Sequence, residues 1–240
     1  MIGELKTVAF DAPDIAALSR FYTSLAGWEQ TYADDDWITL TTIDGWRIGL
    51  QLAPDHVAPR WPDPAHPQQG HLDIRVSDLG AATQHAVELG ATLLREDERW
   101  NTLADPAGHP FDLVNHPDTP HPVIFGVMLD VPDAKAASTF YAELTGKPIT
   151  YEGEGMAMLG NEGEQPVLFQ QVDHFVAPRW PDPAYPQQLH FDIQVDDVEE
   201  AEPKVLALGA TRLPGEGEDW RVYSDPAGKP FCLVWALEED

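Results

Sequence analysis

The sequence has 240 residues, of which 43% are hydrophobic, so it is long enough for one or two domains with a substantial core. Its 14 Lys and Arg against 41 Asp and Glu give a formal net charge of −27, which argues against nucleic acid and anionic membranes, because both require a cationic surface. The single cysteine, Cys232, excludes an internal disulfide, and no apolar run approaches the roughly 18 residues of a membrane helix, so we expect a cytoplasmic protein.

The first half of the sequence predicts two units, each of one strand, one helix and three further strands. Alternating apolar residues predict a strand over 6–11, and apolar residues at helical spacing predict a helix over 15–25. Asp14 is placed to cap this helix and Gly27 to end it. The remaining expected elements are strands at 29–32, 37–41 and 47–52, then a second unit with a strand at 71–76, a helix at 79–89 and strands at 92–95, 101–104 and 111–115.

A proline-rich loop over 53–70 joins the two units. Its prolines favour extended conformations and reduce the entropy that is lost when the loop becomes ordered. Trp61 in this loop, and Trp180 at the matching place in the second half, allow two interpretations. They form a wall for a ligand, or they clamp the loop over a sheet edge.

The second half of the sequence repeats the first. Residues 58–65, APRWPDPA, return letter for letter at 177–184, an offset of 119, and 16 of the 22 positions from 58 to 79 match their counterparts. Three prolines between 115 and 122 mark the joint, since proline discourages both helix and strand. We therefore expect two modules, at residues 1–117 and 123–240.

The paired strand-helix-strand-strand-strand units, each copy ending on an Asp-Pro-Ala-Gly turn before its last strand, resemble the vicinal-oxygen-chelate superfamily. That superfamily contains glyoxalase I, the bleomycin-resistance proteins and the extradiol dioxygenases. Residues 60–74, RWPDPAHPQQGHLDI, are similar to the glyoxalase-like domain proteins within it. The resemblance implies an α+β fold of two tandem modules, in each of which paired βαβββ units form a cupped mixed sheet that holds ligands on its concave face.

Strand alternation indicates which side chains line the cups. In strand 71–76 the apolar Leu72 and Ile74 face the helices, so His71 and Asp73 face the cup. His190 and Asp192 take the same places in the second copy. A carboxylate beside an imidazole suits general acid–base chemistry, so His71 and His190 are the candidate catalytic residues. A neutral histidine that merely braces the strand is the alternative.

The resemblance also implies four metal-ligand positions in a module, one on each of its first, fourth, fifth and last strands. These positions correspond to Thr7, Gly49, His71 and Asp112 in the first copy and to Gly126, Leu168, His190 and Cys232 in the second. The first copy thus keeps two plausible metal ligands, His71 and Asp112, and the second keeps a histidine and a thiol, His190 and Cys232. Gln51, Gln170 and Asp73 are weaker donors. A catalytic divalent ion usually needs about three protein ligands, so we expect no metal cofactor and keep a divalent metal open.

We therefore expect a glyoxalase- and bleomycin-resistance-like protein that binds a small organic molecule, such as an antibiotic-like metabolite, in its cups without a metal. The residues expected to contact it are His71, Asp73, Gln51, Trp61, Asp112, His190, Asp192, Gln170 and Trp180. Two enzyme functions remain open. One is a metal-dependent lyase or isomerase of the glyoxalase type that uses His71 and Asp112, and the other a metal-free enzyme with a histidine as general base. The chain is expected to be a monomer or a homodimer.

Overall fold

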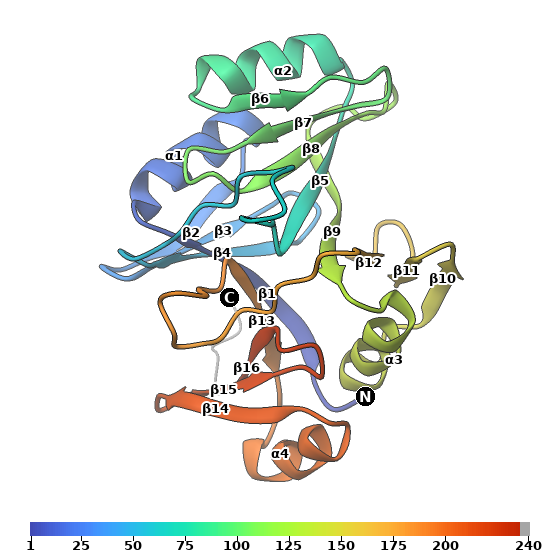
Figure 1. Cartoon of the computed structure of the whole chain (residues 1–240). Helices are drawn as coiled ribbons and strands as arrows, with labels where there is room; N and C mark the ends of the chain where they lie inside the picture. Colours follow the sequence, from blue (N-terminus) through green and yellow to red (C-terminus); the bar gives the residue numbers. More distant parts are fainter. Residues whose placement is uncertain (236–240) are drawn as a thin grey trace.

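The computed structural model describes residues 1–235 and contains two eight-stranded mixed sheets with four helices (Figure 1). This arrangement confirms the expected α+β fold. No helix among the described residues is long and apolar enough to cross a membrane. The first copy consists of β1 (Glu4–Ala12), α1 (Ile15–Ala26), β2 (Glu29–Ala33), β3 (Trp37–Thr41), β4 (Arg47–Leu52), β5 (Gly70–Val76), α2 (Leu79–Glu88), β6 (Thr92–Arg95), β7 (Trp100–Ala104) and β8 (Pro110–Asn115).

The second copy follows the same order. It consists of β9 (Val123–Val131), α3 (Ala134–Thr145), β10 (Ile149–Gly153), β11 (Met156–Leu159), β12 (Val167–Gln171), β13 (Leu189–Gln194), α4 (Val198–Ala207), β14 (Thr211–Glu216), β15 (Trp220–Ser224) and β16 (Pro230–Val234). The expected cap is confirmed: Asp14 accepts a hydrogen bond from the Ala17 amide at 2.8 Å, and Gly27 ends α1 in the left-handed conformation.

Each sheet combines strands of both copies. Sheet 1 has the order β14-β15-β16-β13-β1-β4-β3-β2, and sheet 2 has the order β10-β11-β12-β9-β5-β8-β7-β6. Antiparallel pairing of β1 with β13 joins the copies in sheet 1, and pairing of β5 with β9 joins them in sheet 2 (Figure 1). We expected the two units of one copy to share a sheet. The structure differs because the two copies carry equivalent edge strands, so the first unit of one copy pairs with the second unit of the other copy.

On the helix side of the sheets, the two units of each copy contact each other. In the first copy, Phe21 of α1 stacks edge-on against Phe111 of β8, with ring centroids 5.9 Å apart, and the Tyr22 hydroxyl donates to Asp105 at 3.0 Å. The second copy repeats both contacts, with Phe140 against Phe231 and Tyr141 donating to Asp225. Each copy thus packs its own two units together through helices, and exchanges strand pairing with the other copy.

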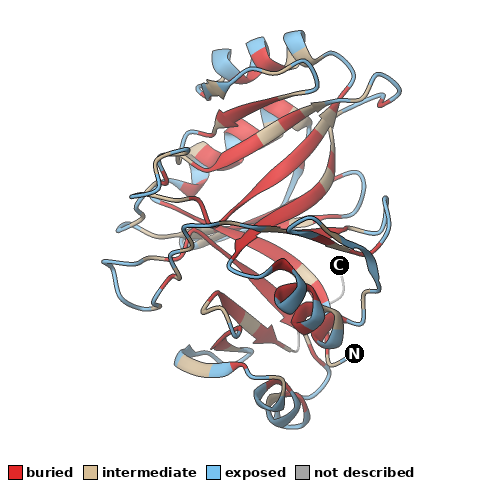
Figure 2. Ribbon diagram, turned by 45° about the vertical axis from the view of Figure 1, so that its right-hand side comes forward, coloured by how far each residue is buried: buried red, intermediate tan, exposed pale blue. Residues whose placement is uncertain are grey.

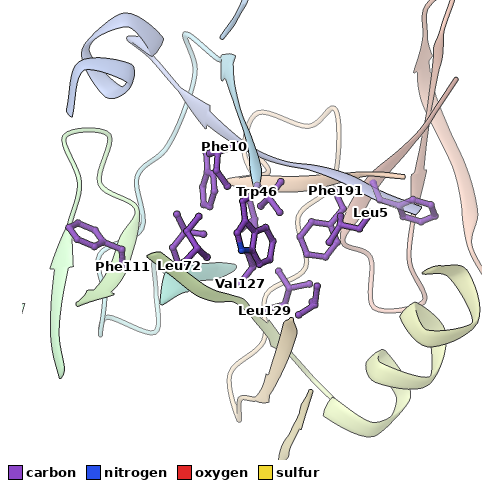
Figure 3. Close-up of a cluster of buried hydrophobic side chains, with 14 of the residues drawn as sticks. Leu5, Phe10, Trp46, Leu72, Phe111, Val127, Leu129 and Phe191 are labelled. Carbon is purple, nitrogen blue, oxygen red and sulfur yellow. The ribbon is translucent and has the colours of Figure 1, made fainter. Parts of the chain in front are cut away.

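The core is continuous between the two sheets. Figure 2 shows that burial is concentrated along the strands and on the inner sides of the helices. Figure 3 shows the side chains where the sheets approach each other, drawn from both copies: Leu5, Phe10, Trp46, Leu72, Phe111, Val127, Leu129 and Phe191. Burial of this shared apolar surface stabilises the crossed arrangement.

A reciprocal pair of glutamines fixes the two copies to each other. The backbone N–H of Gln69 donates to Gln188 Oε1 at 2.9 Å, and the backbone N–H of Gln188 donates to Gln69 Oε1 at the same distance. Their side-chain amides donate to the backbone oxygens of Pro186 and Pro67, at 2.8 and 3.0 Å. Both glutamines are buried, so each bond is protected from water.

We expect Gln69→Ala to lower the free energy of unfolding by about 2–3 kcal/mol, because it leaves the Gln188 amide and the Pro186 oxygen buried without partners. Urea unfolding measures this loss. Gln84→Ala is the control: it removes an exposed hydrogen bond to Glu88 and should change stability by less than about 0.5 kcal/mol. Equal effects of the two substitutions would show that the glutamine pair is not a fixing contact.

Candidate ligand-binding cups

We call the face of sheet 1 that is turned away from the helices cup 1, and the equivalent face of sheet 2 cup 2. Strand register decides which side chains share a face. In sheet 2, His71 lies opposite Met128, while Asp73 lies opposite Gly126 and beside Asp112. Their neighbour Leu72 is only 1% exposed and belongs to the core on the other face. The structure therefore places His71, Asp73 and Asp112 together in cup 2.

These three residues form a polar cluster. His71 Nε2 lies 3.6 Å from Asp73 Oδ1 and 3.9 Å from Asp112 Oδ2, and the side chains are 11%, 12% and 16% exposed. One ligand atom of each lies within 4.8 Å of the others. Both distances from the imidazole exceed a direct hydrogen bond, so a small group could stand between the imidazole and the carboxylates.

Burial dominates the electrostatics of Asp73. Burial first, and the neighbouring Asp112 to a smaller extent, raise the pKa of this carboxyl from 3.8 to about 6, although His71 and Arg75 oppose the shift. A carboxylate held here is therefore short of stabilising partners. Such groups are typical of binding and catalytic sites.

A hydrogen-bond network lies behind His71. The Gln68 amide nitrogen contacts both His71 Nδ1 and Asp130 Oδ1, each at 3.1 Å, and the Gln170 amide donates to the same Asp130 oxygen at 2.7 Å. The predicted ligand residue Gln170 thus supports Asp130. Sequence reasoning missed Asp130 and Gln68, although both recur at an offset of 119 as Asp11 and Gln187.

The opposite wall of cup 2 is apolar. Register places Met128 beside Leu168, and Leu168 opposite Met158 in the next strand, with Met156 opposite Gln170. Three of the four methionines of the chain thus share this face. Methionine is unbranched and polarisable, so such a wall adapts to the shape of an apolar ligand. Sequence reasoning missed it because β9, β11 and β12 belong to the other copy.

Cup 1 places His190, Asp192 and Cys232 together, again within 4.8 Å of one another. His190 Nε2 lies 3.4 Å from Asp192 Oδ1. Burial lowers the pKa of His190, but interactions with Asp192 and Cys232 outweigh it and the pKa lies well above its usual value. Burial raises the pKa of the Cys232 thiol. Gln51, which we expected with His71 of the same copy, lies instead in sheet 1, where it pairs in register with Asp11.

Trp37 lies in cup 1, over Gly49 and near His190. A Cβ added to Gly49 would lie 2.3 Å from Cζ2 of Trp37, so the indole rests on the bare backbone of this glycine. The rings of Trp37 and His190 have centroids 6.3 Å apart, and the indole N–H donates to Thr39 at 2.9 Å. Space for a ligand beside His190 is therefore reduced.

The loop tryptophan Trp180 is hydrogen-bonded to an edge strand of sheet 1. The indole N–H of Trp180 donates to the backbone oxygen of Pro214 in β14 at 3.0 Å, which attaches its loop to a sheet edge. Trp61 lies half-buried in the matching loop of the first copy. The geometry of Trp180 agrees with the clamp interpretation.

The residues of cup 2 do not fit the four-ligand metal ion that the resemblance implies. Because β5 pairs with β9, the positions that join His71 and Asp112 are those of the second copy, Gly126 and Leu168. Neither side chain offers a donor atom, and a Cβ on Gly126 would lie 2.4 Å from Leu168 Cδ1. His71 Nδ1 faces the Gln68 amide nitrogen, whereas the second nitrogen of a metal-bound histidine normally donates a hydrogen bond. What remains is the three-residue cluster of His71, Asp73 and Asp112.

Comparison with known proteins agrees with this architecture. A family model described as "Glyoxalase-like domain" matches residues 7–114 and again residues 126–234. Glyoxalase I from Zea mays superposes with a TM-score of 0.69 at 18% identity, covering 96% of this chain and 92% of that one. A putative dioxygenase from Bacillus subtilis superposes with a TM-score of 0.66 at 10% identity, covering 98% and 86%. No curated protein matches the sequence significantly.

If Trp37 occupies cup 1 as described, Gly49→Ala should lower the free energy of unfolding by about 1–3 kcal/mol, because the new methyl group overlaps the indole. In a Trp37→Ala background the same change should cost at least about 1 kcal/mol less. A double-mutant cycle by chemical denaturation measures this coupling. Gly80→Ala in α2, where a Cβ meets nothing closer than 3.6 Å, is the control and should stabilise by about 0.5–1 kcal/mol. Additive effects at positions 37 and 49 would contradict the contact between the indole and Gly49.

The raised pKa of Asp73 predicts a pH dependence of stability. Because the folded pKa of about 6 exceeds the ordinary 3.8, the folded state binds the proton more tightly, and stability is lost as pH rises from about 4 to above 6. Asp73→Asn removes this loss. Relative to the wild type, the variant should gain about 2–2.5 kcal/mol between pH 4 and pH 7. Thermal unfolding at several pH values tests this, and a constant difference between the two proteins would refute it.

Proposed function

The chain belongs to the glyoxalase-like domain family, and we propose that it binds one small organic molecule in cup 2 without a resident metal ion. The observation that carries the proposal is the division of this cup. The apolar wall of Met128, Met158 and Leu168 faces the polar cluster around His71. A ligand with an apolar body and one polar head would satisfy both sides.

The polar cluster has unused hydrogen-bonding capacity. The distances of 3.6 and 3.9 Å from His71 to Asp73 and Asp112 leave the imidazole and both carboxylates able to bond a further group. Within residues 1–235 no side chain donates a hydrogen bond to either carboxylate at normal distance. A ligand head that donates to them would relieve the cost of burying Asp73.

Charge supports the same class of ligand. The net charge of −27 disfavours anionic molecules and leaves neutral or basic ones, among them antibiotic-like metabolites. A single chain completes both sheets by itself, so a monomer can carry the site. We expect this binding to take place in the cytoplasm.

A metal-dependent lyase or isomerase is the second candidate. The cluster of His71, Asp73 and Asp112 favours it, since these three residues could hold an ion on one side. Against it stand the two ligand positions taken by Gly126 and Leu168 and the amide that faces His71 Nδ1. A general-base function would need an unprotonated imidazole nitrogen facing the cup.

Methyl-labelled methionine gives a direct test of binding. In a screen of amphipathic fragments, molecules that occupy cup 2 should shift the NMR signals of Met128, Met156 and Met158. Met1, which lies against Gly146, should not respond. Asp112→Ala should weaken binding about tenfold or more, since a buried polar contact is lost. Hits that shift Met1 alone, or that bind Asp112→Ala equally well, would place the ligand elsewhere.

Elemental analysis of untagged protein, purified without added metal, separates the two candidates. We expect less than stoichiometric Zn, Ni, Mn or Fe, and thermal unfolding that a chelator does not change. About one ion per chain that is lost in His71→Ala would refute metal-independent binding and favour the glyoxalase-type enzyme.

A further inference from the structure

We infer that Asp130, acting through Gln68, holds His71 as a hydrogen-bond donor at Nε2, and that cup 2 is thereby built for a neutral hydroxyl group on its ligand. This inference rests on the proposed function and names the head group that the cup receives. It also gives a local reason why the cup is unsuited to a metal ion.

The first step is the orientation of the Gln68 amide. A carboxylate only accepts hydrogen bonds, so the atom of Gln68 that faces Asp130 at 3.1 Å must be its nitrogen. The same nitrogen has a second hydrogen, and it lies 3.1 Å from His71 Nδ1. An amide nitrogen cannot accept, so Nδ1 must. The neutral imidazole then carries its proton on Nε2, the atom that faces the cup.

The second step is the stability of Asp130 as an acceptor. It receives a second hydrogen bond from the Gln170 amide at 2.7 Å. The buried ammonium of Lys229, which donates to the backbone oxygen of Gln69 at 2.6 Å, interacts favourably with the Asp130 charge. Two amide donors and a nearby cation thus surround the Asp130 carboxylate, and both amides donate to the same oxygen. Rotating Gln68 would place its oxygen against that carboxylate, which is unfavourable.

The third step is what the cup offers to a ligand. A group between His71 Nε2 and the carboxylates of Asp73 and Asp112 meets one donor and two acceptors. A hydroxyl accepts from Nε2–H and donates to a carboxylate, so it matches both. An ammonium only donates and opposes the Nε2 proton. A carboxylate or a ketone only accepts and meets the negative aspartates.

Cup 1 repeats the same three residue types, His190, Gln187 and Asp11, in different surroundings and provides a matched control. Gln187 donates to Asp11 at 3.0 Å, and its nitrogen lies 3.3 Å from His190 Nδ1. Here Trp37 limits the space and Cys232 joins the cluster. Changes in this network should leave the imidazole of His71 as it is.

Nitrogen NMR of ¹⁵N-histidine-labelled protein tests the positioning role of Asp130 and Gln68. In the wild type we expect His71 to be protonated at Nε2 and unprotonated at Nδ1. The pair Gln68→Glu and Asp130→Asn reverses the bonds that join positions 130, 68 and 71, because the new carboxylate at position 68 accepts from Nδ1–H while the new amide at position 130 donates to that carboxylate. The Gln170 amide, which donates to the same Asp130 oxygen in the wild type, then turns its oxygen toward the new amide. His71 should change tautomer, whereas Gln187→Glu with Asp11→Asn should leave its signals unchanged.

The reversed network should also admit a metal. With Nε2 unprotonated, Co²⁺ alone should bind the Gln68→Glu, Asp130→Asn protein about 10–100-fold more tightly than the wild type, and His71→Ala should abolish the gain. A wild-type His71 protonated at Nδ1, or a tautomer that the double substitution does not change, would overturn the inference. Circular dichroism of both variants shows whether a loss of folding accounts for the result.

Benzyl alcohol, benzylamine and benzoate test the head group with one constant apolar body. Shifts of the Met128 and Met158 methyl signals should give the lowest Kd for the alcohol, by at least about tenfold, one hydrogen bond to a charged group being worth that much. Equal, reversed or absent binding would count against the hydroxyl assignment. Because the fragment screen tests occupancy of cup 2 with any ligand, its failure is distinguishable from a failure of this inference.

Discussion

The pairing of strand edges between the two copies is the constraint on which the rest of the molecule depends. Each unit leaves one edge strand open, and an open edge must be paired or covered. β1 pairs with β13 and β5 pairs with β9, and the reciprocal hydrogen bonds of Gln69 and Gln188 join the two copies at the start of β5 and β13. As a result no cup belongs to one copy. The polar cluster of cup 2 comes from the first copy and its methionine wall from the second.

The two cups are built from equivalent strands of the repeated sequence, but different side chains pack on their faces. At the first- and fourth-strand positions cup 1 has Thr7 and Gly49, and cup 2 has Gly126 and Leu168. A glycine in one strand gives room to a large neighbour in another: Trp37 lies over Gly49, and Leu168 lies over Gly126. The indole takes up space beside His190 in cup 1, while the leucine lies beside Met128 and extends an apolar wall in cup 2. Both cups nevertheless keep a histidine in contact with a glutamine that donates to an aspartate.

Local chemistry made the secondary structure predictable from the sequence, and non-local contacts limited the rest. Alternation and capping residues placed α1 and β5 within a residue or two of their observed bounds. They also put His71 and Asp73 on the cup face. The partner of each unit was not predictable, because the two copies offer equivalent edge strands and the sequence does not distinguish pairing within a copy from pairing between copies. The contact between Gln68 and Asp130 spans 62 positions and both copies, so no spacing in the sequence indicates it.

Asp130 and Asp73, which both lie near His71, differ in how far the protein compensates their negative charge. Asp130 has two amide donors and the nearby Lys229 ammonium, so its charge is compensated by the protein itself. Asp73 is buried like Asp130, but it accepts no side-chain hydrogen bond from the described residues, and only the charges of His71 and Arg75 oppose the rise in its pKa that burial causes. Buried polar groups are normally satisfied, and those that are not mark strain or a missing partner. The compensated aspartate orients the histidine, and the uncompensated one is the group for which a ligand provides the missing hydrogen bond.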